Sequence, residues 1–315
     1  MNATTSAGPS PHGAGQPGFP NLAPKTRIGE MVIKTLLTAA AITSVAITVG
    51  ILYALLRPVI DFFGEVPLSE FFSLRDSEES SFATAIFPWV AATLQVTAIA
   101  LLVAIPFGLG AAMYLSEYAS RRARKVLKPT VELLAGVPSV VYGFFALYFV
   151  TPTLLNDLLD LKVNFTNLLA AGLVLGVMII PTIASLAEDA LSAVPHAMRQ
   201  GSFALGANKM QTTLRVVFPA ALSGIAAAVV LGMSRAIGET MIVALAAGSQ
   251  KHLTWNLQEG AQTMTGKIAQ TLGGEAAVGS DKYNLLFAIA LTLFVITLVI
   301  NAISIALVRR FRQAY

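Results

Sequence analysis

Arg235 and Glu239 are charged residues inside a long apolar run, and they are the side chains best suited to chemistry in this chain. Each costs about 2.5–3.5 kcal/mol at the centre of a membrane helix. Four residues apart on one helix, they share a face and partly neutralise each other. Gly232 and Gly238 flank the pair and let another backbone or a substrate come near. The spacing fits two interpretations: a structural ion pair holding the helix against a neighbour, or a pathway for an anion.

The anion pathway follows from the chemistry of arginine. The guanidinium of Arg235 is permanently charged and presents a fork of N–H donors that suits a tetrahedral oxyanion. Two hypotheses fit Glu239: it holds Arg235 neutralised until substrate arrives, or it accepts a hydrogen bond from a protonated oxyanion. The second favours phosphate over sulfate, which carries no proton at neutral pH, and predicts that Glu239→Gln relaxes discrimination against sulfate.

A second candidate site is the polar segment QGSFALGANKMQTTLRVVFP, residues 200–219, which lies between two apolar runs. Pro195 fits the start of a short helix, and Gly206 permits a turn that a Cβ would resist. Asn208 followed by Gln211 predicts an N-cap with its partner at the third helical position. Pro219 predicts a break before the next span. We expect a helix–turn–helix across the membrane face that fits a groove on a soluble motor; an ordinary surface loop is the alternative.

Composition indicates that lipid, rather than water, surrounds most of this chain. The 315 residues are 55% hydrophobic and 12% charged, against about 25% charged in soluble domains.

The chain has no cysteine, and its three histidines (His12, His196 and His252) are far apart, so we predict no metal site. No phosphate-binding loop of the form G-x-x-x-x-G-K-[ST] occurs, so we predict that this chain is not an enzyme and that another chain hydrolyses ATP.

The apolar runs predict an all-α polytopic membrane protein, because only helices satisfy the backbone of such runs in lipid. Six segments are long enough to cross a bilayer. We place them at 32–56, 86–115, 131–155, 168–186, 220–247 and 285–308. Gly136, Pro138 and Gly143 in the third segment indicate either a tolerated kink or a local break that lines a path. Gly172 and Gly176 in the fourth are typical of a packing face.

Charge in the connecting segments predicts orientation. Basic residues cluster before the first span and after the second, fourth and sixth, whereas the other loops are acidic or mixed. By the positive-inside rule, both termini and these basic loops are cytoplasmic. The clusters recur at every cytoplasmic edge, so we interpret them as membrane anchors rather than a nucleic-acid patch, and expect no nucleic-acid partner. They are Lys25, Arg27 and Lys34; Arg121, Arg122, Arg124, Lys125 and Lys128; Arg199, Lys209 and Arg215; and Arg309, Arg310 and Arg312.

These observations divide the chain into consecutive regions. The Pro- and Gly-rich start lacks the apolar side chains needed to offset ordering entropy and predicts a disordered tail. The regions are a cytoplasmic tail at 1–31, the first transmembrane helix at 32–57, an external acidic loop at 58–85, a region of five spans at 86–308 that contains a polar loop at 188–219, and a basic cytoplasmic tail at 309–315.

The spacing of Gly206, Val216 and Pro219 resembles the coupling-loop signature of ABC importer permeases, which is Glu-Ala-Ala, then glycine, an aliphatic residue and Leu-Pro. In this chain Gln200, Gly201 and Ser202 replace the leading triplet, and Phe218 replaces the leucine. The resemblance implies that residues 86–308 are an ABC transmembrane type-1 permease domain with a coupling loop at 188–219. Within that loop, it implies that Gln200, Gly201, Ser202, Gly206 and Pro219 couple the chain to an ATPase. Gln200 keeps hydrogen-bonding capacity but loses the charge, and with it any salt bridge that the glutamate makes.

Two further strings are similar to those of the C-type permeases of phosphate-specific ABC importers: ELLAGVPSVVYG at 132–143 and SRAIGETM at 234–241. This resemblance implies the type I importer permease fold, a place in the bacterial cytoplasmic (inner) membrane, and inorganic phosphate as substrate. It implies four kinds of partner: an A-type permease in a heterodimer, two ATPase subunits that bind ATP and Mg, an external phosphate-binding protein, and membrane lipid. No cofactor is expected in this chain. The alternatives are a permease for another oxyanion, sulfate or molybdate, and a self-sufficient secondary transporter or channel.

Overall fold

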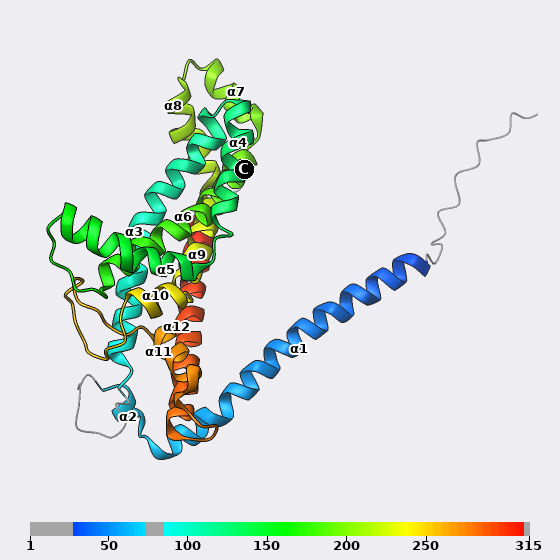
Figure 1. The fold of residues 1–315 in the computed structure, drawn as a ribbon. Coiled ribbons are helices and arrows are strands. Elements are labelled where there is room, and N and C mark those ends of the chain that lie inside the picture. The colour runs from blue at the N-terminus through cyan, green and yellow to red at the C-terminus, as the bar shows by residue number, and fades with distance from the viewer. Residues whose placement is uncertain (1–27, 74–84, 312–315) are drawn as a thin grey trace, which may run out of the picture. The chain divides into compact units, whose positions relative to one another are not determined.

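A computed structural model describes residues 28–73 and 85–311, and all regular structure in those ranges is helical (Figure 1). Several elements are π-helical, labelled η, which means that the backbone hydrogen bonds span one residue more than in an α-helix. The elements in chain order are α1 (Ile28–Glu65), α2 (Leu68–Phe71), α3 (Phe87–Met113), η1 (Tyr114–Tyr118), α4 (Arg121–Leu134), α5 (Ser139–Phe145), η2 (Ala146–Leu158), α6 (Leu168–Ser192), α7 (His196–Ala204), α8 (Lys209–Thr212), η3 (Thr213–Val217), α9 (Phe218–Ile237), α10 (Met241–Ala246), α11 (Met264–Gln270), η4 (Thr271–Glu275) and α12 (Asp281–Phe311).

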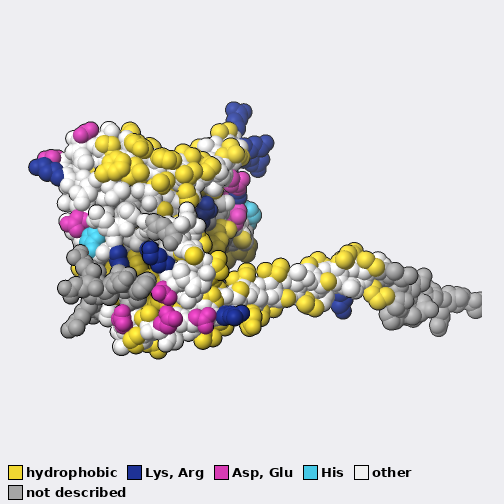
Figure 2. Space-filling view, turned by 60° about the horizontal axis from the view of Figure 1, so that its bottom comes forward, with side chains coloured by type: hydrophobic (Ala, Val, Ile, Leu, Met, Phe, Trp, Pro, Cys, Tyr) yellow, Lys and Arg dark blue, Asp and Glu magenta, His cyan; other side chains and the backbone are white. Residues whose placement is uncertain are grey.

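The described residues contain six helices that are long and apolar enough to cross a membrane, which confirms the predicted all-α, six-span architecture. Hydrophobic side chains cover long stretches of the surface in the space-filling view (Figure 2). That surface is suited to lipid rather than water. The spans are Gly29–Glu65, Phe87–Tyr118, Ser139–Leu158, Leu168–Ser192, Lys209–Ile237 and Asp281–Ala306.

The first span is longer than the predicted helix at 32–57. Helix α1 begins at Ile28, within the predicted tail, and continues through Pro58 to Glu65, within the predicted external loop. Its residues through Leu52 form a unit of their own, and the chain from Tyr53 forms a second unit. The remainder of the predicted N-terminal tail, residues 74–84 of the acidic loop and residues 312–315 lie outside the described ranges.

The third span begins later than predicted, because residues 131–134 belong to the preceding helix. Helix α4 ends at Leu134, and the span starts at Ser139 with Pro138 as its N-cap. A residue before proline is disfavoured in the helical region, so Pro138 keeps Val137 out of the helix and α4 cannot continue into α5. The sequence left open a kink or a break, and the structure has a break. Helix α4 carries no buried residue and lies outside the spans.

The fifth span differs from its prediction at both ends. It runs from Lys209 to Ile237 without the break predicted at Pro219, and then stops at Gly238 before α10 begins at Met241. The π-helical η3 lies directly before Pro219. A proline inside an α-helix clashes with the carbonyl four residues earlier, and the wider π geometry moves that carbonyl away. The chain therefore passes Pro219 as a continuous helix.

The core of the second unit lies between α3 and α6, where glycines allow close approach. A Cβ on Gly172 would stand 2.6 Å from Ile99 Cβ, and one on Gly176 would stand 2.8 Å from the carbonyl oxygen of Ala100. The prediction that Gly172 and Gly176 form a packing face is confirmed. Helix α6 is consequently the central element, and both candidate sites are built against it.

Candidate functional site

Arg235 lies in the last turn of α9 and its side chain is exposed in this single chain. Its Nη1 donates a hydrogen bond to Thr182 Oγ1 on α6 at 2.9 Å. A guanidinium has five N–H groups, and the others make no hydrogen bond with the described residues. An arginine within a membrane span is costly against lipid, so such residues face a bundle interior or a water-filled cavity.

Glu239 lies in the break between α9 and α10 and does not pair with Arg235. Its Oε1 accepts hydrogen bonds from the backbone N–H groups of Met241 at 2.9 Å and Ile242 at 3.4 Å. Because α9 ends at Ile237, the two side chains are not on one helix face as the four-residue spacing predicted. The structure therefore does not have the ion pair of the first hypothesis for Glu239. The second carboxylate oxygen accepts no hydrogen bond from the described residues.

The break at Gly238 explains how the membrane tolerates two charges that do not pair. A helix carries a partial negative charge at its C-terminus and a partial positive charge at its N-terminus. Arg235 lies at the C-terminal end of α9, and Glu239 binds the N-terminal N–H groups of α10. Each side chain is therefore placed at a helix end of opposite sign.

Neighbouring elements hold both sides of this break. Ser234 Oγ donates to Asn301 Oδ1 on α12 at 2.6 Å, and Thr265 Oγ1 on α11 donates to the carbonyl oxygen of Glu239 at 2.7 Å. On the α6 side, a Cβ on Gly232 would stand 2.8 Å from Ile183 Cγ1, so α9 packs closely there. We call Arg235, Glu239 and Thr182 the membrane polar site.

The second site, α7–α8, is a helix–turn–helix, as predicted. Helix α7 ends in a Schellman motif: Gly206, with φ +84°, donates to the carbonyl of Phe203, and Ala207 donates to that of Ser202. Helix α8 then begins at a capping box, in which Asn208 and Gln211 each bond the other's backbone N–H. The Oγ of Ser202 and Oγ1 of Thr212 lie 2.9 Å apart and join the two helices.

The structure separates the predicted coupling residues by role. Gln200 and Gly201 are exposed on α7, Ser202 and Gly206 shape the turn, and Pro219 lies farther along, inside the fifth span. The surface of the turn is instead formed by exposed apolar side chains that the sequence analysis did not select. They are Phe203, Leu205 and Met210, with exposed fractions of 47%, 91% and 62%. Their signal in the sequence was apolar residues within an otherwise polar segment.

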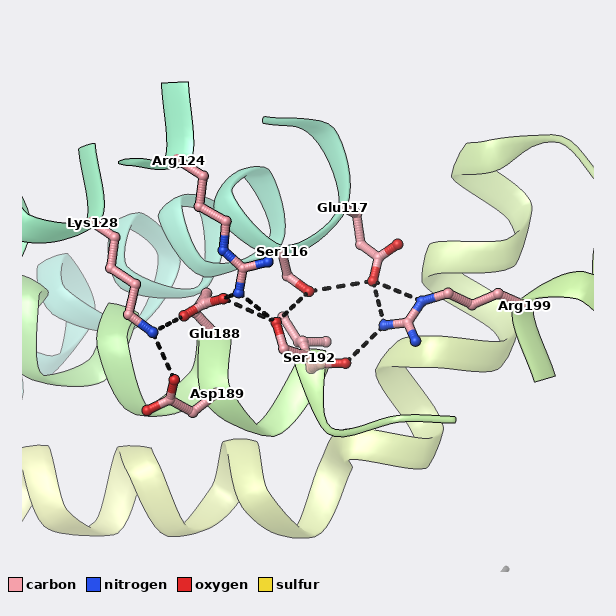
Figure 3. Close-up of polar contacts among 9 residues, drawn as sticks. Ser116, Glu117, Arg124, Lys128, Glu188, Asp189, Ser192 and Arg199 are labelled. Carbon is pink, nitrogen blue, oxygen red and sulfur yellow. Dashed lines mark hydrogen bonds and ion pairs between the residues drawn. The ribbon is translucent and has the colours of Figure 1, made fainter. Parts of the chain in front are cut away.

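Polar contacts fix α7–α8 to the end of the second span (Figure 3). Arg199 on α7 donates to Glu117 Oε1 on η1 from Nη2 at 2.8 Å, and also donates to the carbonyl of Leu191 at 2.8 Å. Lys209 Nζ lies 5.0 Å from the ring centroid of Tyr118, a cation–π contact. Both helices of the turn are thus attached to η1.

A second group of charges joins α4 to α6. Glu188 on α6 is fully buried, and it binds Arg124 Nη2 and Lys128 Nζ, the latter at 2.6 Å. Lys128 also binds Asp189 at 2.8 Å, and Ser192 Oγ donates to Glu188 at 2.9 Å. The pKa of Lys128 is raised above its ordinary value, first by its hydrogen bond with Asp189 and then by Glu188. We call Arg124, Lys128, Glu188 and Asp189 the α4–α6 clamp.

The clamp revises the interpretation of the basic cluster after the second span. Arg124 and Lys128 were interpreted as membrane anchors, yet both side chains form ion pairs with Glu188 of the same chain. Glu188 and Asp189 were placed at the start of the predicted coupling loop, but they lie in α6, which continues to Ser192. Residues 28–73 and 85–311 contain no group of three or more His, Asp or Glu side chains placed to hold a metal ion.

Comparison with known protein families gives a match over most of the second unit. The family described as "Binding-protein-dependent transport system inner membrane component" matches residues 104–313. Three curated relatives illustrate the similarity. The probable ABC transporter permease protein YqgH of Bacillus subtilis is 35% identical over 86% of this chain and 88% of its own length. The phosphate transport system permease protein PstC of Mesorhizobium japonicum is 33% identical over 67% and 69%. PstC 1 of Mycobacterium tuberculosis is 35% identical over 71% and 72%.

Solved structures share the fold at lower sequence identity. A bacterial ABC transporter chain, in complex with an alginate pentasaccharide-bound periplasmic protein, superposes with a TM-score of 0.64 at 18% identity, over 92% of this chain and 99% of that chain. A chain of the MetNI methionine ABC transporter in an inward-facing conformation superposes with a TM-score of 0.54 at 20% identity, over 72% and 94%. These likenesses concern the fold alone.

Proposed function

Because the chain belongs to the family of binding-protein-dependent transport system inner membrane components, we propose that it is the permease subunit through which an ABC importer moves inorganic phosphate. Membership makes it a multi-pass inner-membrane transport subunit rather than the ATPase. The names of the curated PstC relatives support phosphate as the substrate. The observation that carries the proposal is the exposed guanidinium of Arg235 within a membrane span, with a single hydrogen bond to the residues that the structure describes.

The membrane polar site fits a protonated oxyanion. Arg235 supplies positive charge and unused N–H donors, whereas Glu239 offers one carboxylate oxygen that accepts no hydrogen bond from the described residues. Phosphate at neutral pH carries both acceptor oxygens and a proton, so it matches a donor and an acceptor together. Sulfate and molybdate lack the proton and match only the arginine.

The helix–turn–helix α7–α8 is the surface that meets the ATPase. Leu205 is 91% exposed at a turn fixed by the Schellman motif and the capping box, so an apolar tip is presented on a rigid support. In this arrangement α4, α7, α8 and both termini are cytoplasmic, as the positive-inside rule predicts. Two copies of the ATPase bind ATP and Mg²⁺, an A-type permease completes the membrane pair, and a phosphate-binding protein delivers substrate from the other side.

The test is uptake of radiolabelled phosphate by cells that lack their own importer and co-express this chain with a complete set of partner subunits. We expect uptake that requires the ATPase and is lost in Arg235→Ala. Arg122→Ala removes an exposed arginine outside the spans and serves as the matched control. Uptake without the ATPase would contradict the proposal. Normal uptake by Arg235→Ala would show that Arg235 is not part of the substrate pathway.

The substrate is tested separately, because an external binding protein can impose its own selectivity. The permease–ATPase complex in nanodiscs, without binding protein, is titrated with radiolabelled phosphate in the presence of sulfate. We expect sulfate to compete poorly with wild type and better with Glu239→Gln, which loses the carboxylate acceptor. Sulfate that displaces phosphate equally from both proteins would reassign the substrate to oxyanions in general.

A further inference from the structure

Thr182 is the hydrogen-bond partner of Arg235, and no pattern in the sequence singles it out. It lies on α6, half-buried, one residue after Pro181, and it reaches Arg235 across the contact between α6 and α9. Arg235 makes no hydrogen bond to another described residue, so Thr182 alone orients its guanidinium.

The packing of the two helices explains why these side chains meet. Ile183 follows Thr182 on α6 and fills the space that a Cβ on Gly232 of α9 would need, at 2.8 Å. Gly232 and Arg235 are three residues apart and share a face of α9. The close approach at Gly232 therefore sets the register that brings Thr182 opposite Arg235.

The hydroxyl of Thr182 does not make the bond to its own helix backbone that several other threonines in the described spans make. Thr93, Thr97 and Thr292 each donate their hydroxyl hydrogen to the carbonyl four residues earlier. Thr182 makes no such bond: its oxygen accepts from Arg235, and its hydrogen is not donated to any described residue. A hydroxyl can accept and donate at the same time, so its donor remains available beside the unused donors of Arg235.

We propose that Thr182 is a further substrate-binding residue of the permease, which both positions the Arg235 guanidinium and donates its hydroxyl hydrogen to an oxygen of the transported oxyanion. The inference rests on the proposed function of the membrane polar site. It completes a site with donors from two helices, Arg235 on α9 and Thr182 on α6, and one acceptor, Glu239, in the break. A monoprotonated tetrahedral oxyanion is the substrate class that uses all three.

The experiment uses proteoliposomes that contain the complete importer, with phosphate-loaded binding protein on the external side. Phosphate import and ATP hydrolysis are measured in parallel, and the readout is phosphate moved per ATP hydrolysed. Thr182→Val keeps the shape and removes the hydroxyl, Thr182→Ser restores the hydroxyl, and Arg235→Ala tests the underlying site. Thr292→Val is the matched control, because it makes the same substitution on α12, where the hydroxyl donates only to the carbonyl of Ala288.

For Thr182→Val we expect roughly a tenfold fall in phosphate moved per ATP, the size of one lost hydrogen bond to a charged group. ATP hydrolysis stays close to wild type, Thr182→Ser recovers the ratio, and Thr292→Val is close to wild type. If Arg235→Ala loses import while Thr182→Val keeps the full ratio, this inference fails and the proposed function stands. A normal amount of phosphate moved per ATP in Arg235→Ala would show that the membrane polar site does not bind the substrate.

A purely structural role for Thr182 has a different signature. In that case import and ATP hydrolysis fall together in Thr182→Val, the ratio is unchanged, and the inference is overturned. Amounts of each variant in the membrane are measured alongside, so that both rates refer to folded complex.

Discussion

Glu188 shows at the scale of one residue how this chain accommodates a charge. It is fully buried on α6, whereas its partners Arg124 and Lys128 keep 40% and 30% of their side chains exposed. Losing the carboxylate leaves two cations that can still reach water. Losing both cations leaves a buried carboxylate with no counterion, which is the costlier change.

This asymmetry predicts an order of stability. Glu188→Gln should lower the free energy of unfolding by about 1–3 kcal/mol, and the double variant Arg124→Ala/Lys128→Ala by about 3–5 kcal/mol. Melting of the protein in nanodiscs measures both, with Arg121→Ala/Lys125→Ala as a control that removes two exposed cations of the same helix. Equal melting of the two clamp variants would contradict the asymmetry.

The pKa of Lys128 fixes the pH dependence of the same clamp. Because the folded value is raised, the stabilisation is fully present below the ordinary lysine pKa and is lost only as pH rises through the higher folded value. The lysine contacts of the clamp therefore do not weaken across the neutral range.

At the scale of elements, the turn between α7 and α8 depends on one backbone conformation. Gly206 has φ +84°, which an L side chain rarely adopts, yet a Cβ there would meet no atom within 4 Å. Gly206→Ala is therefore strained by conformation alone, at about 1–2 kcal/mol. Because the strain falls on the tip that carries Leu205, we expect reduced ATP-driven uptake with the spans intact.

Gly201→Ala is the matched control, since Gly201 lies in α7 and a Cβ there also meets open space. Alanine in a helix interior is more stable than glycine by roughly 0.5–1 kcal/mol. The two substitutions should thus shift melting in opposite directions. A Gly206→Ala protein that melts and transports like Gly201→Ala would show that the turn does not need its glycine.

Sequence analysis predicted the apolar spans of the fold well and their exact ends poorly. The six spans were found because long apolar runs are sufficient evidence for membrane helices. The predicted ends were wrong where hydropathy does not mark the boundary. Residues 131–134 are mostly apolar but belong to α4, and Pro138 separates that helix from the third span. The passage through Pro219 depends on the π-helical η3, which has no simple signature in the residues.

The sites were predictable to the extent that their residues are local in the sequence. The capping box of Asn208 and Gln211 spans four residues and was predicted correctly. Arg235 and Glu239 were selected because charges are rare in apolar runs, but their separation depends on the end of α9. Thr182 and the partners of Glu188 come from distant segments, and only the packing of α6 against α9 and α4 brings them together.

At the scale of the whole molecule, the absence of cysteine gives a direct test of topology. Single cysteines can be introduced into an otherwise thiol-free chain. Leu205, at the α7–α8 turn, and Trp255, between α10 and α11, are 91% and 73% exposed, so both positions should accept a label.

We expect a membrane-impermeant maleimide to label Trp255→Cys in intact cells and Leu205→Cys only after the membrane is opened. The reason is the basic residues that flank the α7–α8 segment. Labelling of both in permeabilised cells is the control for reactivity. Labelling of Leu205→Cys in intact cells would reverse the proposed orientation and place the coupling surface on the wrong side for an ATPase.

The third span has a consequence for how the ribosome and translocon build this protein. It is the shortest and least hydrophobic of the described spans, and insertion into the bilayer depends on hydrophobicity. Its Gly143 packs against Leu245 of α10, where a Cβ would stand 2.7 Å from Leu245 Cδ1. That partner is synthesised only after two further spans have been made. This segment therefore enters the membrane before the contact that holds it exists, and its final placement is a late step in biogenesis.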